Sequence, residues 1–235
     1  MQMVAPLDRL RNAETWLFDL DNTLYPAECN LFAEMERRMG GFIVERFKVD
    51  PEEAHRRRRH FFQTHGTTLR GLMLEHGIEP EDFLDYVHDI PLDALAPLPE
   101  FARSLAALPG RRLIFTNGTV RHAERVLEKL GLSGLFEDVF DIVASKYIPK
   151  PAPGPYEALI RRHGVNPADC VMVEDMARNL KPAAALGMMT VWVPTRADWS
   201  QPEEEAGYIH HVAPHLPAFL AEVNAAQPAE NVAAG

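Results

Sequence analysis

The stretch Asp19-Leu20-Asp21-Asn22-Thr23-Leu24 follows the apolar run Trp16-Leu17-Phe18 near the start of this 235-residue chain. If the run is a buried parallel strand, the two carboxylates emerge at its carboxyl end, where open α/β sheets bind ligands. Residues two apart on an extended segment point to the same side of it. The stretch therefore predicts that one carboxylate attacks an electrophile while the other transfers a proton.

The segment after Leu24 changes from strand to helix. Apolar side chains recur at helical spacing from about residue 30 to residue 89. Asp50-Pro51 and Pro80-Glu81-Asp82 are typical of helix starts, since proline suits the first helical position. We expect residues 25–96 to form a small all-helical cap inserted after the first strand.

Strands and helices alternate in the remainder of the chain. The pattern predicts strands at residues 112–115, 139–144, 170–173, 189–193 and 208–212, and helices at 100–108, 120–130, 155–163 and 179–186. This alternation implies a parallel sheet with helices on both faces. We expect residues 1–24 and 97–223 to form a Rossmann-like α/β core, and residues 224–235 to be a disordered tail.

The composition excludes several classes of protein. The formal net charge of -10 argues against binding of nucleic acid polymers, which requires a positive surface. No stretch approaches the roughly 18 consecutive apolar residues of a membrane span, and the first 13 residues lack the features of a signal peptide. Cys29 and Cys170 make no disulfide framework. We expect a cytoplasmic monomer or homodimer.

Polar residues of particular kinds follow the later strands. Thr116-Asn117-Gly118 ends the second strand, and its hydroxyl, amide and glycine suit hydrogen bonding to phosphate oxygens. Lys150 follows the third strand, where it can neutralise an oxyanion and hold a nearby carboxylate ionised. Glu174 and Asp175 end the fourth strand, and carboxylate oxygens are ligands that Mg²⁺ prefers. Asn179 either starts the next helix or orients a metal ligand.

Together these four groups predict a phosphoryl-transfer site. Asp19 would attack phosphorus and form an aspartyl phosphate, with Mg²⁺ neutralising the charge that develops. Asp21 would protonate the leaving oxygen and then activate water. Thr116, Asn117 and Lys150 would hold the transferring group.

In this order and spacing, the four motifs resemble those of the haloacid dehalogenase superfamily over about residues 15–212. The resemblance implies that the side chain of Asp19 and the backbone carbonyl of Asp21 bind Mg²⁺. It implies that Asp175 completes the metal site, with Glu174 close to the ion or bound through water. It also implies that the helical insertion is a cap that defines the leaving group.

A narrower resemblance is to the pyrimidine 5′-nucleotidase subfamily of fungi, plants and bacteria. It lies in residues 19–26, 64–72 and 115–118, together with His122 and Arg125. For Arg70, in the cap segment, substrate contact and a structural salt bridge both stay open. His65 stands where the subfamily often has tyrosine, which leaves the base preference open. Tyr25 has either a packing or a substrate role.

The leading hypothesis is a Mg²⁺-dependent phosphomonoesterase acting on a small phosphorylated metabolite, with pyrimidine nucleoside 5′-monophosphates as first candidates. A phosphoglycolate or sugar-phosphate phosphatase and a phosphomutase stay open, because the core motifs do not select the leaving group. A 2-haloacid dehalogenase would need neither metal nor Asp21. A non-catalytic binding module would be expected to have lost one of these groups.

The four successive arginines Arg56–Arg59 stand in the expected cap. Successive residues of a helix point all round its axis, so they cannot form a single patch. A solvated face of a cap helix is the expectation.

Overall fold

The computed structural model describes residues 7–203 and 206–225. Its sheet has six parallel strands in the order β3-β2-β1-β4-β5-β6. They are β1 (Thr15–Phe18), β2 (Arg111–Phe115), β3 (Asp138–Phe140), β4 (Cys170–Glu174), β5 (Met189–Trp192) and β6 (His211–Val212). β1 pairs with β2 on one side and β4 on the other. The strand order reverses at this central strand, so the carboxyl end of β1 is the position where such sheets bind ligands.

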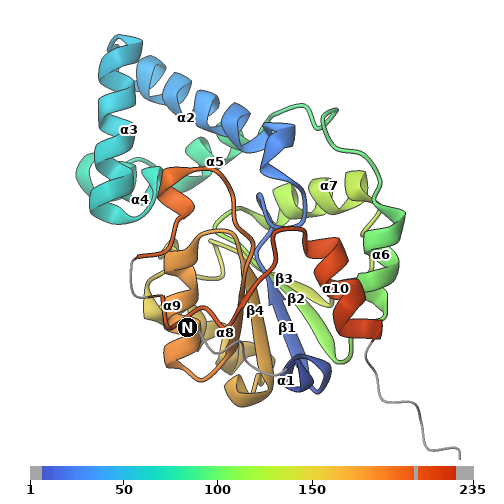
Figure 1. Cartoon of the computed structure of the whole chain (residues 1–235). Helices are drawn as coiled ribbons and strands as arrows, with labels where there is room; N and C mark the ends of the chain where they lie inside the picture. Colours follow the sequence, from blue (N-terminus) through green and yellow to red (C-terminus); the bar gives the residue numbers. More distant parts are fainter. Residues whose placement is uncertain (1–6, 204–205, 226–235) are drawn as a thin grey trace, which may run out of the picture.

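Successive side chains of β1 enter different cores because side chains of a strand alternate between its faces. Trp16 and Phe18 pack in one hydrophobic cluster, and Leu17 packs in another. The first cluster includes residues of α1 (Asp8–Arg11), α6 (Pro99–Ala106), α7 (Val120–Leu130) and α10 (Leu216–Ala225). The second includes residues of α8 (Pro153–His163) and α9 (Ala177–Ala185), so helices cover both faces of the sheet (Figure 1).

Four helices lie between β1 and β2 in the sequence, and we call them the helical insertion. They are α2 (Leu31–Phe47), α3 (Pro51–His65), α4 (Thr68–His76) and α5 (Pro80–His88). Helix α3 begins at Pro51, where the Asp50 carboxylate accepts a hydrogen bond from the Glu53 amide at 2.8 Å. It ends at His65, and the following Gly66 has a φ of +85°, a left-handed conformation that glycine adopts without strain. Figure 1 shows the insertion beyond the carboxyl end of the sheet.

The expected fold class is confirmed: the chain has a parallel sheet with helices on both faces. The third strand is shorter than expected, since it ends at Phe140 instead of Ala144. The Asp141 carboxylate accepts hydrogen bonds from the amides of Val120 and Ala144, and this local bonding turns the chain away from the sheet. The last strand is also shorter, with only His211–Val212.

The sequence predicts a disordered tail from Asn224 onward, and this prediction is wrong for Asn224 and Ala225, which are helical. Helix α10 continues to Ala225, and the Asn224 side-chain amide donates to the Ser104 carbonyl at 2.9 Å. This bond, with the apolar packing of α10 against α6, extends the helix; residues 226–235 lie outside the described residues. Among the described helices, none combines the length and apolar character needed to cross a bilayer.

Candidate active site

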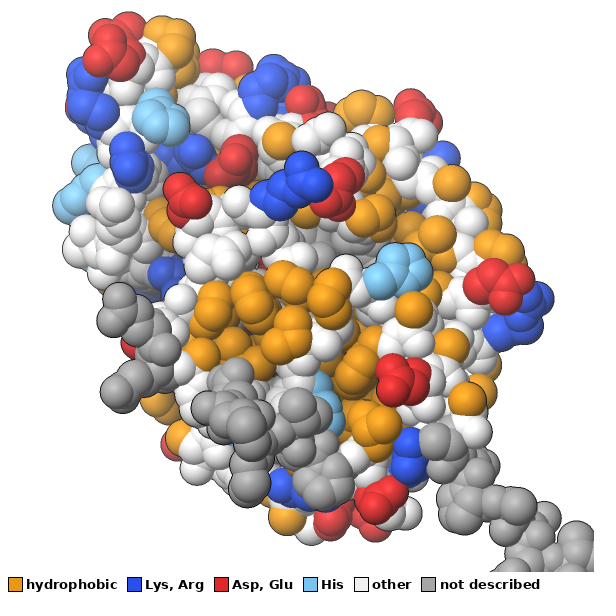
Figure 2. Space-filling view, viewed as in Figure 1, with side chains coloured by type: hydrophobic (Ala, Val, Ile, Leu, Met, Phe, Trp, Pro, Cys, Tyr) orange, Lys and Arg blue, Asp and Glu red, His pale blue; other side chains and the backbone are white. Residues whose placement is uncertain are grey.

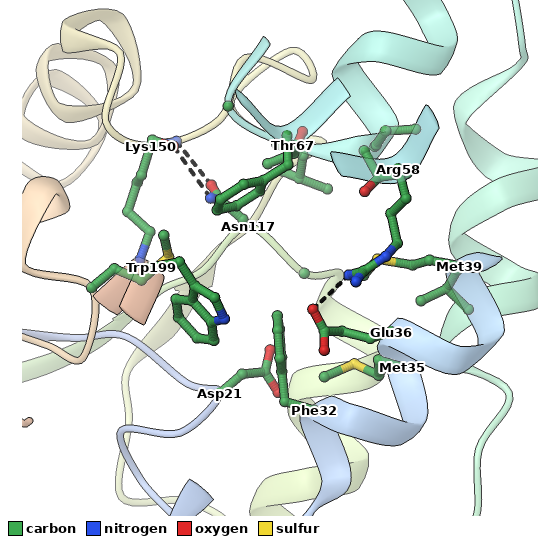
Figure 3. A pocket seen from close by; sticks show the side chains of 18 of the residues that line it. Asp21, Phe32, Met35, Glu36, Met39, Arg58, Thr67, Asn117, Lys150 and Trp199 are labelled. Atoms are coloured by element: carbon green, nitrogen blue, oxygen red, sulfur yellow. Dashed lines mark hydrogen bonds and ion pairs between the residues drawn. The ribbon is translucent and has the colours of Figure 1, made fainter. Parts of the chain in front are cut away.

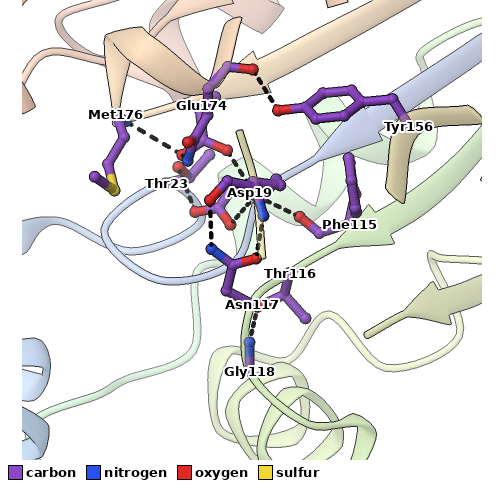
Figure 4. A network of polar contacts seen from close by, with 11 residues as sticks. Asp19, Thr23, Phe115, Thr116, Asn117, Gly118, Tyr156, Glu174 and Met176 are labelled. Atoms are coloured by element: carbon purple, nitrogen blue, oxygen red, sulfur yellow. Dashed lines mark hydrogen bonds and ion pairs between the residues drawn. The ribbon is translucent and has the colours of Figure 1, made fainter. Parts of the chain in front are cut away.

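Asp19 lies directly beyond β1, and its side chain is buried. Its amide donates to the Val173 carbonyl at 2.9 Å, which extends the pairing with β4 by one residue. Its Oδ1 accepts a hydrogen bond from Lys150 Nζ at 2.7 Å, and its Oδ2 accepts one from Thr23 Oγ1 at 3.2 Å (Figure 4). The sheet and these two donors therefore fix the orientation of the carboxylate.

The ammonium group of Lys150 is buried with the side chain 1% exposed, and it joins three elements of the core. It donates to Asp19 Oδ1 at 2.7 Å, to Glu174 Oε2 at 2.6 Å and to the Phe115 carbonyl at 2.7 Å. An ammonium has three N–H donors, so these three partners use them all. Burial by itself would lower the pKa of Lys150, but the charges of Asp19 and Glu174 outweigh burial and raise it.

An acidic cluster of three buried residues, Asp19, Glu174 and Asp175, lies at the ends of β1 and β4. One carboxylate oxygen from each lies within 4.8 Å of the others. Burial, followed by the charge of Glu174, raises the pKa of Asp19 to about 7 against the opposing effect of Lys150. The pKa of Asp175 is raised for the same two reasons. Three carboxylates face one lysine here, so the ionised cluster needs further positive charge.

The donor atoms of this cluster fit a divalent cation. Asp175 Oδ2 is buried and has no hydrogen-bond partner among the described residues. Glu174 Oε1 instead accepts from the Met176 amide at 3.2 Å and the Asn179 side-chain amide at 3.1 Å. Hard carboxylate oxygens of this kind suit Mg²⁺. Asp175 thus offers an unpaired oxygen to an ion, whereas Glu174 is already held by three donors.

Asp21 has different surroundings from the acidic cluster. Its Oδ1 interacts with the Tyr25 hydroxyl at 2.6 Å and with His122 Nε2 at 2.9 Å, and both groups can donate to it. Burial alone would raise the pKa of Asp21, but the charge and hydrogen bond of His122 and the hydrogen bond of Tyr25 lower it. The ring of His122 stacks on that of His88, with centroids 4.4 Å apart. Tyr25 precedes the insertion and His88 ends α5, so Asp21 connects to both ends of the insertion.

Thr116, Asn117 and Gly118 follow β2 and line the same cavity as Asp19. Thr116 Oγ1 accepts from the Gly118 amide at 2.9 Å, which stabilises the turn. Asn117 Oδ1 accepts from the Lys150 amide at 2.9 Å. The side chains of this motif therefore position the loop and Lys150, and the loop borders the space beside Asp19.

A cavity of about 670 Å³ lies between the carboxyl edge of the sheet and the helical insertion. This volume is in the range of small-molecule sites. Much of its wall is apolar and includes Phe32, Met35, Met39, Phe62 and Trp199. Figure 3 shows Asp21, Phe32 and Trp199 on one side of this space, with Glu36 and Arg58 of the insertion facing it. In Figure 2, charged side chains of both signs gather over the upper part of the molecule, where the insertion lies.

Most of the expected site residues line the cavity, but Arg70 and Asp175 are not among its lining residues. The residues that precede Arg70, which are Thr67, Thr68 and Leu69, line the cavity, but Arg70 does not. Successive residues on a helix point about 100° apart, so the turn that directs Leu69 into the cavity directs Arg70 elsewhere. Arg70 is thus half-buried in α4, outside the cavity lining.

The residues that sequence reasoning missed come from three distant segments. Arg58 and Arg59 line the cavity, so the run of four arginines is not a wholly solvated face. Arg178 of α9 lies over the Phe62 ring at 4.5 Å and donates to the Gly66 carbonyl at 3.3 Å, which connects core and insertion. Helical periodicity could have placed Arg58 on the face of α3 opposite Arg56, but no local pattern marks Trp199.

A second group of potential metal ligands lies on the insertion. His60 Nε2 and His65 Nε2 both contact Glu75 Oε1, at 2.9 and 2.6 Å. His60 and Glu75 are exposed, unlike the three members of the acidic cluster. Of these two groups in the described part of the chain, the buried cluster is the one that contributes to the cavity lining, through Asp19 and Glu174.

Residues 14–187 match the family model of the haloacid dehalogenase-like hydrolases. The chain belongs to this family. Three solved structures have a related fold. The first is L-2-haloacid dehalogenase from Xanthobacter autotrophicus, with a TM-score of 0.56 and 19% identity over 92% of this chain and 100% of that one. The HAD hydrolase YfnB from Bacillus subtilis, bound to magnesium, has a TM-score of 0.52 and 17% identity over 91% of this chain and 99% of that one. A HAD phosphatase from Thermococcus onnurineus has a TM-score of 0.54 and 20% identity over 85% and 92%.

Several curated relatives of this hydrolase are named for phosphate chemistry. Phosphate metabolism protein 8 of Saccharomyces cerevisiae is 28% identical over 193 residues, covering 74% of this chain and 60% of that protein. Enolase-phosphatase E1 of Xylella fastidiosa is 27% identical, covering 64% and 61%. Fructose-1-phosphate phosphatase YqaB of Escherichia coli is 34% identical over 109 residues, covering 45% and 56%. The chain thus spans less than two thirds of the length of these relatives.

Proposed function

We propose that this hydrolase cleaves phosphate monoesters with Mg²⁺ through an aspartyl-phosphate intermediate. The observation that carries the proposal is the separation of two kinds of carboxylate at one sheet edge. The acidic cluster around Asp19 has one lysine and an unpaired Asp175 oxygen, and so fits a cation. Asp21 lies outside this cluster and is held by the side chains of Tyr25 and His122. This division suits a nucleophile that faces phosphate and a separate group that moves protons.

Each residue has one role in the proposed reaction. A carboxylate oxygen of Asp19 forms a bond to phosphorus, and the bond to the leaving oxygen breaks. Asp21 gives a proton to the leaving oxygen, and then takes one from the water that attacks the aspartyl phosphate. Phosphate leaves and the Asp19 carboxylate is restored. The lowered pKa of Asp21 keeps its carboxylate in the ionised form, which is the form that accepts the proton from water.

Asp19 and Asp175, with the backbone carbonyl of Asp21, would hold Mg²⁺. When bound, the ion supplies the positive charge that lets a carboxylate approach a phosphate. Glu174 would act next to the ion, because Lys150, Met176 and Asn179 already occupy its oxygens. Lys150 keeps Asp19 and Glu174 oriented, and the loop with Thr116, Asn117 and Gly118 would receive the phosphate oxygens.

For the substrate we infer a pyrimidine nucleoside 5′-monophosphate. The similarity of residues 19–26 and 64–72 to pyrimidine 5′-nucleotidases supports this choice. A cavity of about 670 Å³ with aromatic walls also suits a planar base and its ribose. We assign residues 25–96 as the cap that encloses the leaving group, and residues 1–24 and 97–223 as the core.

A phosphate-release screen tests the proposal. The untagged chain would be assayed with Mg²⁺ on UMP, CMP, AMP, fructose 1-phosphate and phosphoglycolate, and on 2-chloropropionate for chloride release. We expect phosphate release from UMP and CMP that stops with EDTA and returns with Mg²⁺. Chloride release that survives EDTA would instead identify a dehalogenase. Good turnover of fructose 1-phosphate without turnover of UMP or CMP would refute the proposed nucleotide substrate but support the proposed phosphatase activity.

A further inference from the structure

The part of the cavity wall that the insertion supplies contains an ion pair. Glu36 of α2 and Arg58 of α3 meet with Oε1 and Nη1 at 2.5 Å, and both residues line the cavity. Their side chains are 33% and 20% exposed, so part of each charge is removed from water. Nearby wall residues, such as Phe32, Met35 and Met39, are apolar. Ligand sites commonly combine an apolar wall with a few placed polar groups.

The neighbouring arginines show that α3 does not need this pair to neutralise its charge. Arg56 contacts Glu52 and Glu53, and Arg57 contacts Glu53, all within the same helix. Neither Arg56 nor Arg57 lines the cavity. Arg58 instead crosses to another helix, and Figure 3 shows both members of its pair facing the space beside Asp21.

We propose that Glu36 and Arg58 form the subsite that recognises the leaving group of the phosphate ester, and that this group is an uncharged planar ring with a hydrogen-bond donor beside an acceptor. The guanidinium is a donor only and the carboxylate an acceptor only. Side by side, they match an amide-like edge, such as the N3–H and a carbonyl of uracil or the N4 amino group and N3 of cytosine. The aromatic side chains Phe32 and Trp199, whose ring centroids lie 5.6 Å apart with the ring planes tilted by 45°, supply apolar ring surface in the same cavity.

The same pair disfavours a leaving group that carries a carboxylate. A lone arginine would attract such a group, but Glu36 already neutralises Arg58, so the pair presents no net positive charge. An anionic leaving group such as that of phosphoglycolate would gain no net attraction from this pair, although Arg59 and Arg178 also line the cavity. The inference rests on the proposed phosphatase function and adds to it a reason for selecting among phosphate esters.

The test compares three phosphate esters in matched variants. The kcat/KM would be measured on UMP, on phosphoglycolate and on 4-nitrophenyl phosphate, whose ring has no amide edge. We expect Glu36→Gln and Arg58→Gln each to lower kcat/KM for UMP about tenfold, because a charged hydrogen-bond partner is lost, with little change for 4-nitrophenyl phosphate. Glu36→Gln should also raise activity on phosphoglycolate relative to UMP. The control is Arg56→Gln, on the same helix but outside the cavity, which should leave the ratio of the three esters unchanged.

A second pair of measurements separates recognition from a structural role and from failure of the proposed function. The reversed pair, Glu36→Arg with Arg58→Glu, should recover the thermal stability of the wild type but not its preference for UMP. Binding of uridine would be measured by calorimetry, which needs no turnover, and should weaken about tenfold in Glu36→Gln. If no ester is hydrolysed but uridine binding depends on Glu36, the phosphatase proposal fails and the subsite stands. Equal changes on all three esters, or uridine binding equal in wild type and both single variants, would overturn the subsite.

Discussion

The carboxyl edge of the sheet and the helical insertion hold their charged side chains in opposite ways. At the sheet edge, Lys150 is 1% exposed and bonds two carboxylates and a carbonyl. On the insertion, pairs such as Arg56 with Glu52 lie on helix surfaces, with side chains 57% and 85% exposed. Exposed pairs contribute little to stability, whereas removing one partner of a buried pair leaves an uncompensated charge.

This difference separates the two tasks of the site. A buried network that holds Asp19, Glu174 and Lys150 tolerates few substitutions, so the proposed chemistry belongs to the core. The insertion can exchange surface charges at small energetic cost, so its residues are free to define the leaving group. The glutamate–arginine pair at residues 36 and 58 is intermediate, since it is part-buried and faces the cavity.

The largest expected effect is that of Asp19→Asn in the core. Turnover of phosphate esters should fall by about 10³-fold or more, because an amide cannot replace the attacking carboxylate. Phosphate release and circular dichroism measured together would separate lost chemistry from lost folding. Asp93→Asn, at an exposed position outside the cavity, is the control and should keep wild-type turnover. Near-normal turnover by the Asp19 variant would rule out the nucleophile.

Lys150→Met tests whether the core network is needed for stability. The change leaves Asp19 and Glu174 buried without their shared cation, and we expect it to lower the free energy of unfolding by about 3–5 kcal/mol. Urea denaturation would measure this loss. The exposed Lys129→Met, whose ion pair with Asp93 is 4.0 Å long, should change stability by about 0.5 kcal/mol or less. Equal stability of the two variants would remove the contrast between buried and exposed pairs.

Tyr25→Phe tests the link between the insertion and Asp21. The variant loses one of the two donors to Asp21 Oδ1, so we expect kcat to fall about tenfold with a smaller change in KM. The phenylalanine ring can keep the packing that the ring of Tyr25 has in the core. Tyr208→Phe is the matched control, because its buried hydroxyl has no hydrogen-bond partner among the described residues. A wild-type kcat in the Tyr25 variant would show that this hydroxyl does not position Asp21.

The smallest expected effect is that of Arg70→Gln on the insertion. Because Arg70 does not line the cavity, kcat/KM for UMP should change by about twofold or less, in contrast to Arg58→Gln. Steady-state kinetics on the two variants side by side would measure the difference. A larger loss of kcat/KM in Arg70→Gln than in Arg58→Gln would show that α4, and not α3, contacts the substrate.

Local pattern was sufficient for much of the core. The apolar run before Asp19, the proline starts and the alternation of strand and helix patterns predicted five of the strands and most helices to within a few residues, since burial and helix capping act over short distances. The length of the third strand was overestimated because the Asp141 side chain accepts hydrogen bonds from two backbone amides. Alternation of apolar residues does not reveal such bonds.

The candidate site was predictable only in part. Asp19 and Asp21 follow β1, Lys150 comes after β3 along the chain, and Glu174-Asp175 stand at the end of β4. Parallel strands bring their carboxyl ends to one edge of the sheet. The side of α3 that faces the cavity depends on how that helix packs on α2. Sequence reasoning therefore missed Arg58 and selected Arg70, although both are arginines on insertion helices.

The amino-acid sequence by itself determined the parallel α/β core, the helical insertion and the residues at the strand ends, because these follow from periodicity and from the order of the strands. Only the tertiary structure decided how those groups divide their contacts: Lys150 between Asp19 and Glu174, and Tyr25 and His122 on Asp21. It also decided which insertion residues enclose the cavity. The physical reason is that hydrogen bonds between residues up to 131 positions apart depend on packing, which no local pattern records.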